Sequence, residues 1–358
     1  MTAGTRLTKS TLVTVSHAIE RAALASAEDG PMVVIALFQR LPYFERERAV
    51  YERIAAAAAV TVVGMVGAKP ADLPPGSWAT VLEEDDDLAR EWTVAVLTPR
   101  FGAVLVARDR EEVDGTAATI ESGRLFDGGW WFRRDDALHE VLRLRAALAD
   151  RLPPAARAAI EDVVERVRHL PPAPGESRAD AAVRLVVEHA RRDRARLLEA
   201  RRGPAGAAPG LTGDTGLRRW AGADGVTASG TLPVALLGLR VRHAEPLSEH
   251  LGRGAAARRA ETVIATVTAR LRPADRATRL DEDEFLLVLP GLMQEEVVAL
   301  AYRIAEDVAA AGERSPFLSA TATVVVTVTR QRPLPVDRVR EALNWAVRSG
   351  VPVATVGD

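Results

Sequence analysis

The stretch RLDEDEFLLVLP, Arg279–Pro290, places four consecutive acidic residues before a run of large apolar residues. ATRL before the acids and FLLVLP after them predict two buried strands, so the acids are expected at the tip of a hairpin. Because side chains of an extended chain alternate between faces, four successive carboxylates cannot converge on one ion. The spacing also lacks the turn glycine and the later bidentate acid of a calcium loop. A solvated hairpin tip is the simplest interpretation.

The elements around this hairpin predict an α+β domain over residues 214–358. TLPVALLGLRV predicts a strand before the hairpin, and helices are expected at about 247–271 and 293–311. The long strand FLSATATVVVTVT, the helix VDRVREALNWAVRSG and the strand VPVATV follow. This order predicts an antiparallel-rich sheet beneath helices, a palm-like layout.

Residues 1–152 predict a separate α/β domain, because helical and strand patterns alternate there. TLVTVSHAIERAAL and PYFERERAVYERIAAAAA have helical spacing, whereas PMVVIALF and VTVVGMVG are typical of buried strands. WTVAVLTPRFGAVLVARD predicts a hairpin, RLFDGGWWF a further strand, and residues 135–152 a helix.

Between these domains, residues 153–202 predict a helical connector and residues 203–213 a Gly/Pro/Ala-rich linker. Apolar residues in the second connector helix follow the alternating spacing of a coiled-coil seam, at Val183, Val187, Ala190 and Leu197. The seam would make a homodimer through the connector helices; the alternative is that the stripe packs on its own domain.

Composition excludes several classes of function. The net charge of -2 gives no basic field for nucleic acid or a membrane surface, and the arginines of 189–202 alternate with acids as on a solvated helix face. There is no cysteine, so thiolate zinc sites and disulfides are excluded. The six histidines show no metal-ligand spacing, and no nucleophile constellation is visible, so no metal, cofactor or catalytic residue is expected. The polar start and the shortness of the longest uncharged run predict a cytoplasmic protein.

Residues 214–358 resemble the GGDEF domain of diguanylate cyclases. The resemblance is carried by TGLRR (Thr215–Arg219), by RPADRATRLDEDEF (Arg272–Phe285) and by the order of elements. In this alignment, the signature of the family falls on Asp281, Glu282, Asp283, Glu284 and Phe285. Asp281 and Glu282 replace the two glycines, whereas the other three residues are of the family's types.

The departures from the family pattern imply a pseudoenzyme. The family's glycines let the backbone approach GTP, whereas Asp281 and Glu282 add bulk and negative charge beside the triphosphate. Gly238 takes the place of a metal-binding Asp, which leaves Asp283 without its partner, and HAEPLSEHL lacks the residues that read guanine. An active cyclase is the less favoured alternative.

Arg272 and Asp275 fall where the family has an Arg-x-x-Asp turn that binds cyclic di-GMP, and Arg276 and Arg279 add positive charge nearby. A guanidinium can donate two parallel hydrogen bonds to a phosphate, and a carboxylate can accept from guanine. The resemblance therefore implies a cyclic di-GMP receptor. Two alternatives stay open: a purely structural Arg–Asp pair, and a nucleotide-independent scaffold for a protein partner.

The N-terminal domain resembles the DICT sensory domain of bacterial signalling proteins. VVIALFQRLPYFERERAVYERIA (Val33–Ala55), TVVGMVG and WTVAVLTPRFGAVLVARD carry this resemblance. Gln39, Arg40 and Tyr43 follow a predicted strand, a common place for ligand contacts in α/β sheets. The alternative is that Tyr43 is a core anchor and that Gln39 and Arg40 form the surface at the helix entry. The complete chain is thus predicted to be a bacterial signal-transduction protein, a sensor joined to a degenerate GGDEF domain.

Overall fold

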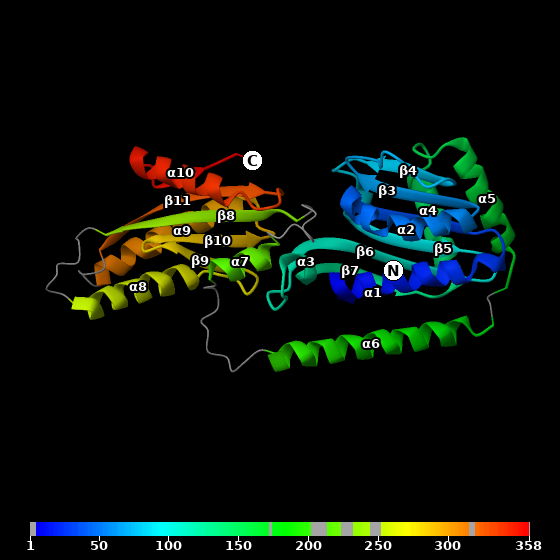
Figure 1. Ribbon diagram of the computed structural model, residues 1–358, viewed down its shortest axis with the longest axis horizontal. Helices are drawn as coiled ribbons and strands as arrows, with labels where there is room; N and C mark the ends of the chain where they lie inside the picture. Colours follow the sequence, from blue (N-terminus) through cyan, green and yellow to red (C-terminus); the bar gives the residue numbers. More distant parts are fainter. Residues whose placement is uncertain are drawn as a thin grey trace. The chain divides into compact units, whose positions relative to one another are not determined.

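Two separate β-sheets organise the chain, each in its own unit (Figure 1). The computed structural model describes residues 5–171, 174–201, 213–222, 232–243, 252–314 and 319–357. The N-terminal unit comprises residues 1–110 and 125–204, and the C-terminal unit comprises residues 111–124 and 205–358. The predicted fold classes, α/β and α+β, are confirmed. No helix among the described residues is long and apolar enough to cross a membrane.

The N-terminal sheet has seven strands in the order β1-β7-β6-β5-β2-β3-β4. They are β1 (Thr5–Thr8), β2 (Val33–Arg40), β3 (Val60–Val66), β4 (Ser77–Leu82), β5 (Glu91–Leu97), β6 (Gly102–Val113) and β7 (Arg124–Trp131). β2, β3 and β4 are parallel, whereas β5 pairs antiparallel with both β2 and β6. The sheet is therefore mixed.

Helices cover both faces of this sheet, which explains why the central strands β2 and β3 are buried at almost every position and are mostly apolar. α1 (Lys9–Ala25) and α2 (Leu41–Ala57) pack on the face that carries Val34 and Ala36. α4 (Arg134–Ala147) and α5 (Pro154–Arg168) pack on the face that carries Val33 and Ile35. Short 3-10 helices, η1 (Ala27–Asp29) and η2 (Asp87–Arg90), precede β2 and β5.

The segment predicted as a connector is helical, as expected, but its first helix belongs to the N-terminal core. α5 buries Ile160, Val163 and Val164 beneath the sheet because these residues share one helix face. α6 (Glu176–Arg201) follows in the same unit. The predicted linker, residues 203–213, lies almost wholly outside the described residues.

The C-terminal sheet has five strands in the order β12-β11-β8-β10-β9. They are β8 (Val234–His243), β9 (Arg276–Asp281), β10 (Glu284–Pro290), β11 (Ala320–Thr329) and β12 (Val353–Thr355). All pairs are antiparallel except that of β11 with β12. The hairpin predicted from RLDEDEFLLVLP is the β9–β10 pair.

Two helical layers cover this second sheet. α8 (Gly252–Thr268) and α9 (Gln294–Arg314) lie on one face. α7 (Asp214–Ala221) and α10 (Val336–Ser349) lie on the other, together with residues of the 111–124 segment, which contains α3 (Ile120–Gly123). Gly238 of β8 lies beneath α10, where an added Cβ would come within 2.8 Å of Val339 Cγ1. The glycine therefore allows the helix to pack closely on the strand.

Candidate functional site

A β-bulge at the end of β2 positions one of the predicted sensor residues. The register of β2 against β3 shifts between Phe38 and Arg40, so that Gln39 is the extra residue. Bulges re-aim side chains and are common beside functional sites. Gln39 is buried, and its amide nitrogen lies 3.3 Å from the Arg90 carbonyl oxygen. As a result, the consecutive residues Phe38 and Gln39 both line one pocket.

This pocket has a volume of about 80 Å³ and lies between α1, α2 and the sheet. Its lining is apolar at Val13, Phe38 and Trp92 and polar at Lys9, Ser16, His17, Gln39, Tyr43, Arg46 and Glu47. The volume has room for a few waters or a small ligand. A small apolar-walled pocket with convergent polar groups is the usual form of a ligand site.

The three predicted sensor residues do not all reach this pocket. Gln39 and Tyr43 line it, and Lys9 donates a hydrogen bond of 3.0 Å to the Tyr43 hydroxyl. Arg40 instead pairs with Glu84 at 2.8 Å, on the other side of the bulge. Ligand binding by Gln39 and Tyr43 stays a prediction, whereas the pocket lining does not include Arg40.

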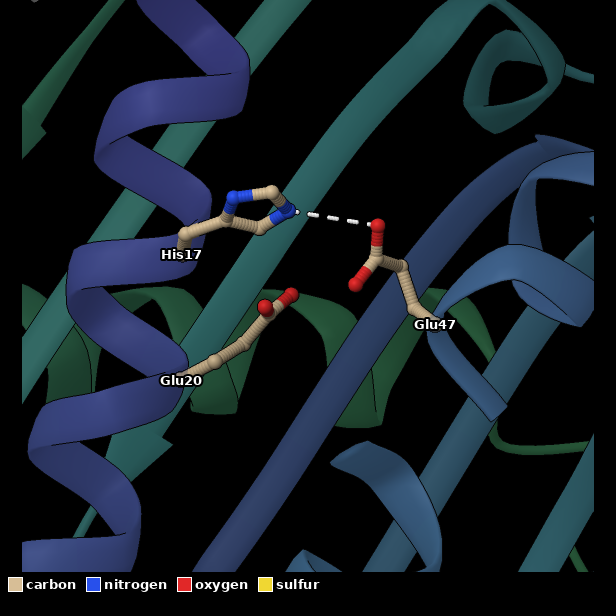
Figure 2. Close-up of side chains that lie close together, drawn as sticks. All are labelled: His17, Glu20 and Glu47. Carbon is tan, nitrogen blue, oxygen red and sulfur yellow. Dashed lines mark hydrogen bonds and ion pairs between the residues drawn. The ribbon is translucent and has the colours of Figure 1, made fainter. Parts of the chain in front are cut away.

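A cluster of three titratable side chains, His17, Glu20 and Glu47, lies beside the pocket (Figure 2). His17 and Glu20 are one turn apart on α1, and Glu47 comes from α2. His17 Nε2 lies 3.2 Å from Glu47 Oε1. The pKa of Glu20 is raised to about 7, mainly by burial and also by the charge of Glu47, against the lowering effect of hydrogen bonds from Ser16 and Tyr51 and of nearby His17.

The sequence contains only part of the signal for this cluster. The spacing of His17 and Glu20 puts them on one helix face, but histidine spacing alone predicted no metal site. Glu47 joins them only because α1 and α2 pack side by side on the same face of the sheet. That packing cannot be seen in a single linear motif.

In the C-terminal unit, two acids of the signature hairpin contact Arg240 and His243 of β8. The register pairs Glu284 with Arg240, and these two side chains form an ion pair. Arg240 also donates to Asn344 Oδ1 of α10, at 2.7 Å. Asp283, which was expected to lack its metal-binding partner because Gly238 takes that position, has its Oδ1 3.1 Å from His243 Nε2. Side chains of β8 therefore already contact both acids, Glu284 through a guanidinium and Asp283 through an imidazole.

The other signature residues lie as hairpin geometry predicts. Asp281 and Glu282 are exposed at the turn, whereas Phe285 is buried in the core. Arg279 donates through Nε to the carbonyl oxygens of Asp281 and Glu282, at 3.1 and 3.0 Å. Arg279 thus holds the turn and is not gathered with Arg272.

Arg272 and Asp275 form a closed pair. The Asp275 side chain accepts from the Arg272 backbone N–H at 2.7 Å and from the guanidinium at 2.8 to 3.2 Å. Arg272 Nη2 also donates to the Pro290 carbonyl, at 2.8 Å. Asp275 is 1% exposed, whereas the Arg272 side chain is 44% exposed. Of the two side chains, only that of Arg272 is therefore accessible to a ligand.

Arg276 is also engaged within its own unit. Its guanidinium donates to the carbonyl oxygens of Pro273, Asp275 and Gly115 and lies 5.1 Å from the centre of the Trp220 ring. The four arginine and aspartate positions predicted to bind cyclic di-GMP therefore do not form one open site. Their ligand binding stays a prediction.

The comparisons with known proteins begin with the N-terminal unit. Residues 3–110 match the model of the DICT family, described as "Sensory domain in DIguanylate Cyclases and Two-component system". This region is a DICT domain. It contains α1, β2 and α2, and hence both the pocket and the His17 cluster. The presence of a sensory domain indicates a role in signal transduction.

Solved structures that contain GGDEF domains resemble part of the chain. The diguanylate cyclase SiaD in complex with its activator SiaC, from Pseudomonas aeruginosa, has 24% identity and a TM-score of 0.38, covering 63% of this chain and 88% of that one. The GGDEF domain of DgcB from Caulobacter crescentus, in complex with c-di-GMP, has 16% identity and a TM-score of 0.34, covering 43% and 98%. The FimX GGDEF domain from Pseudomonas aeruginosa has 14% identity and a TM-score of 0.35, covering 43% and 100%. A search of curated proteins found no match.

Proposed function

We propose that the chain is a non-catalytic signal-transduction protein. Its DICT domain senses a ligand in the pocket between α1 and α2, and its GGDEF-like unit does not convert GTP. The observation that carries the second part is the pairing of the hairpin acids with Arg240 and His243 of β8.

The donor set at this hairpin does not fit the Mg²⁺ ions that a diguanylate cyclase needs. Magnesium requires oxygen ligands in a near-octahedral arrangement. The central strand supplies a guanidinium, an imidazole and the bare backbone of Gly238, which is covered by α10. The Arg240 guanidinium already pairs with Glu284, and breaking a largely buried ion pair is costly. No catalytic step is therefore assigned to this unit.

Turnover of GTP is the direct test. The full-length protein is incubated with GTP and Mg²⁺ or Mn²⁺, and nucleotide products and pyrophosphate are measured beside an active diguanylate cyclase. We expect no product above the buffer control. Product that disappears in an Asp283→Asn variant would overturn the proposal, because it would show that the hairpin acids bind metal after all.

A second function, reception of cyclic di-GMP, is favoured by one observation: the side chain of Arg272 is 44% exposed. A bound nucleotide could contact this group from solvent, although Asp275 is buried and held by Arg272. Calorimetric titration of the full-length protein tests this function. Binding that is lost in Arg272→Lys and kept in Arg270→Ala would support it, because lysine keeps the charge but cannot donate two parallel hydrogen bonds. A folded protein that gives no heat would leave a protein-interaction role for the C-terminal unit.

A further inference from the structure

His17, Glu20 and Glu47 bring one imidazole and two carboxylates together. One ligand atom from each lies within 4.8 Å of the others. The three side chains point toward a common space between α1 and α2 (Figure 2). Among the described residues, these three are the group of His, Cys, Asp or Glu side chains whose ligand atoms lie close enough together to hold one metal ion.

The donor set selects a class of ion. Imidazole suits zinc and other first-row transition metals, and carboxylates complete such sites at about 2.0–2.2 Å from the metal. Calcium and magnesium prefer sites built from oxygen alone. Ligands of one metal lie about 3–4 Å apart at these bond lengths, so a small movement of the half-exposed His17 and Glu47 would bring the three donors together.

The charge balance of the cluster also calls for a cation. Glu20 is 2% exposed, yet its two hydrogen bonds come from neutral hydroxyl groups: Ser16 at 3.0 Å and Tyr51 at 3.4 Å. Both hydroxyl groups donate to the same carboxylate oxygen, Oε1. A buried carboxylate is costly unless it is paired with a cation or coordinates a metal.

The two hydroxyl groups are arranged as an outer shell for a metal ligand. Ligating carboxylates are themselves usually hydrogen-bonded, and these bonds hold the ligand in position. Tyr51 is completely buried, and burial raises the pKa of its hydroxyl well above the usual value, so the group stays a neutral donor. Ser16 lies one turn before Glu20 on α1 and donates along the helix.

We propose that His17, Glu20 and Glu47 bind one divalent first-row transition-metal ion, such as Zn²⁺. Three protein ligands leave at least one coordination position open, as in zinc sites that bind water or a substrate. Because His17 and Glu47 also line the pocket, the open position faces the space beside Gln39 and Tyr43. The metal site does not depend on whether the C-terminal unit converts GTP.

Calorimetric titration of Zn²⁺ into the chelator-treated, full-length protein tests this inference. Mn²⁺ and Mg²⁺ are titrated separately, and thermal unfolding is recorded with and without Zn²⁺. We expect one Zn²⁺ per chain, tighter binding than for Mg²⁺, and an increase in Tm on binding. In His17→Ala and Glu20→Gln, the affinity should fall by about tenfold or more.

His169→Ala is the matched control, since His169 pairs with Glu165 on an exposed helix face and has no third ligand. This variant should bind Zn²⁺ as the native protein does. Absence of binding by the folded native protein, or equal affinity in native and Glu20→Gln protein, would overturn the proposal. Glu20→Gln keeps the shape of the side chain, and its circular dichroism spectrum shows whether the variant is folded. A GTP assay on the same samples separates failure of this inference from failure of the non-catalytic assignment.

Discussion

Glu20 in the N-terminal unit and Asp275 in the C-terminal unit are both almost completely buried, but their surroundings differ. Asp275 accepts four hydrogen bonds from Arg272, three of them from the guanidinium. Glu20 accepts two hydrogen bonds from hydroxyl groups and has a second carboxylate, Glu47, beside it. The Asp275 carboxylate is therefore paired with the Arg272 guanidinium, whereas the Glu20 carboxylate is hydrogen-bonded by neutral hydroxyl groups.

This difference indicates where each unit can bind a ligand. A buried charge that is already paired stabilises a turn and offers little to a ligand. A buried carboxylate that is not paired with a cation favours binding of a positively charged ligand, and carboxylates with such perturbed pKa values are common at functional sites. We therefore propose that the N-terminal unit binds a ligand, and we expect the Arg272–Asp275 pair to act mainly in stabilising its turn.

Replacing Arg272 with alanine should cause the largest loss of stability. Asp275 would remain buried as an unpaired carboxylate, and breaking a buried pair in this way costs about 3–5 kcal/mol. Urea unfolding of the full-length protein at pH 7 measures the effect. Arg270→Ala is the control, because Arg270 forms a similar pair with Asp307 at the surface, where solvent screens the two charges and the loss of stability should be much smaller. Equal effects of the two variants would show that Asp275 does not need its partner.

Replacing Glu20 with glutamine should instead increase the stability of the metal-free protein. The pKa of Glu20 is about 7 in the folded protein against 4.5 as the reference value, so ionisation destabilises the metal-free fold increasingly between these two pH values and fully above pH 7. Glu20→Gln should therefore stabilise metal-free protein by about 3 kcal/mol at pH 8, but by about 1 kcal/mol or less at pH 5.

Urea unfolding at the two pH values checks this prediction, with Asp275→Asn as the comparison. Asp275→Asn should destabilise the protein at pH 8, because it removes the charge that Arg272 pairs with. A loss of stability in Glu20→Gln at pH 8 without metal would mean that Glu20 already has a sufficient partner in the protein.

The fold was largely predictable from periodicity, and the exceptions have physical reasons. PMVVIALF and VTVVGMVG are recognisable as strands because both of their faces are buried. β1 was missed since TRLT is a short, mostly polar edge strand, and β4 alternates exposed and buried positions in a segment without strong flanking signals. α5 was assigned to a connector because its apolar stripe does not reveal which surface it covers.

The site was predictable only where neighbouring residues carry it. Gln39 at the end of β2 and Tyr43 in α2 both line the pocket, and their position at the end of a predicted strand was enough to single them out. The separation of Gln39 from Arg40 depends on a bulge that no residue type announces. The pairing of Glu284 with Arg240 depends on the register of β10 against β8, which is set by tertiary packing. The cluster of His17, Glu20 and Glu47 likewise needs two packed helices.

Replacing Arg240 with alanine should cause an intermediate loss of stability. Glu284 is buried and would lose its cation, as Asp275 does without Arg272, but it lies close to the hairpin end. We expect a loss of about 2 kcal/mol, measured by urea unfolding, and no GTP turnover in the variant. Appearance of turnover would show that Arg240 alone blocks catalysis.

Replacing Tyr51 with phenylalanine should have the smallest effect. The variant loses one long hydrogen bond to Glu20, which is worth about 1 kcal/mol or less. The same change should weaken Zn²⁺ binding, since it removes an outer-shell donor. Unfolding and Zn²⁺ titration of the variant measure the two effects, and an unchanged Zn²⁺ affinity would remove Tyr51 from the site.

Hydrogen–deuterium exchange of the full-length protein, followed by mass spectrometry, compares the two units most directly. The chelator-treated protein is measured alone, with Zn²⁺, and with GTP and Mg²⁺. We predict that Zn²⁺ slows exchange in peptides from α1 and α2, and that GTP with Mg²⁺ leaves peptides from β9 and β10 unchanged. Protection of the β9–β10 hairpin by GTP and Mg²⁺, with no effect of Zn²⁺ on α1 and α2, would contradict the assignment of ligand binding to the N-terminal unit.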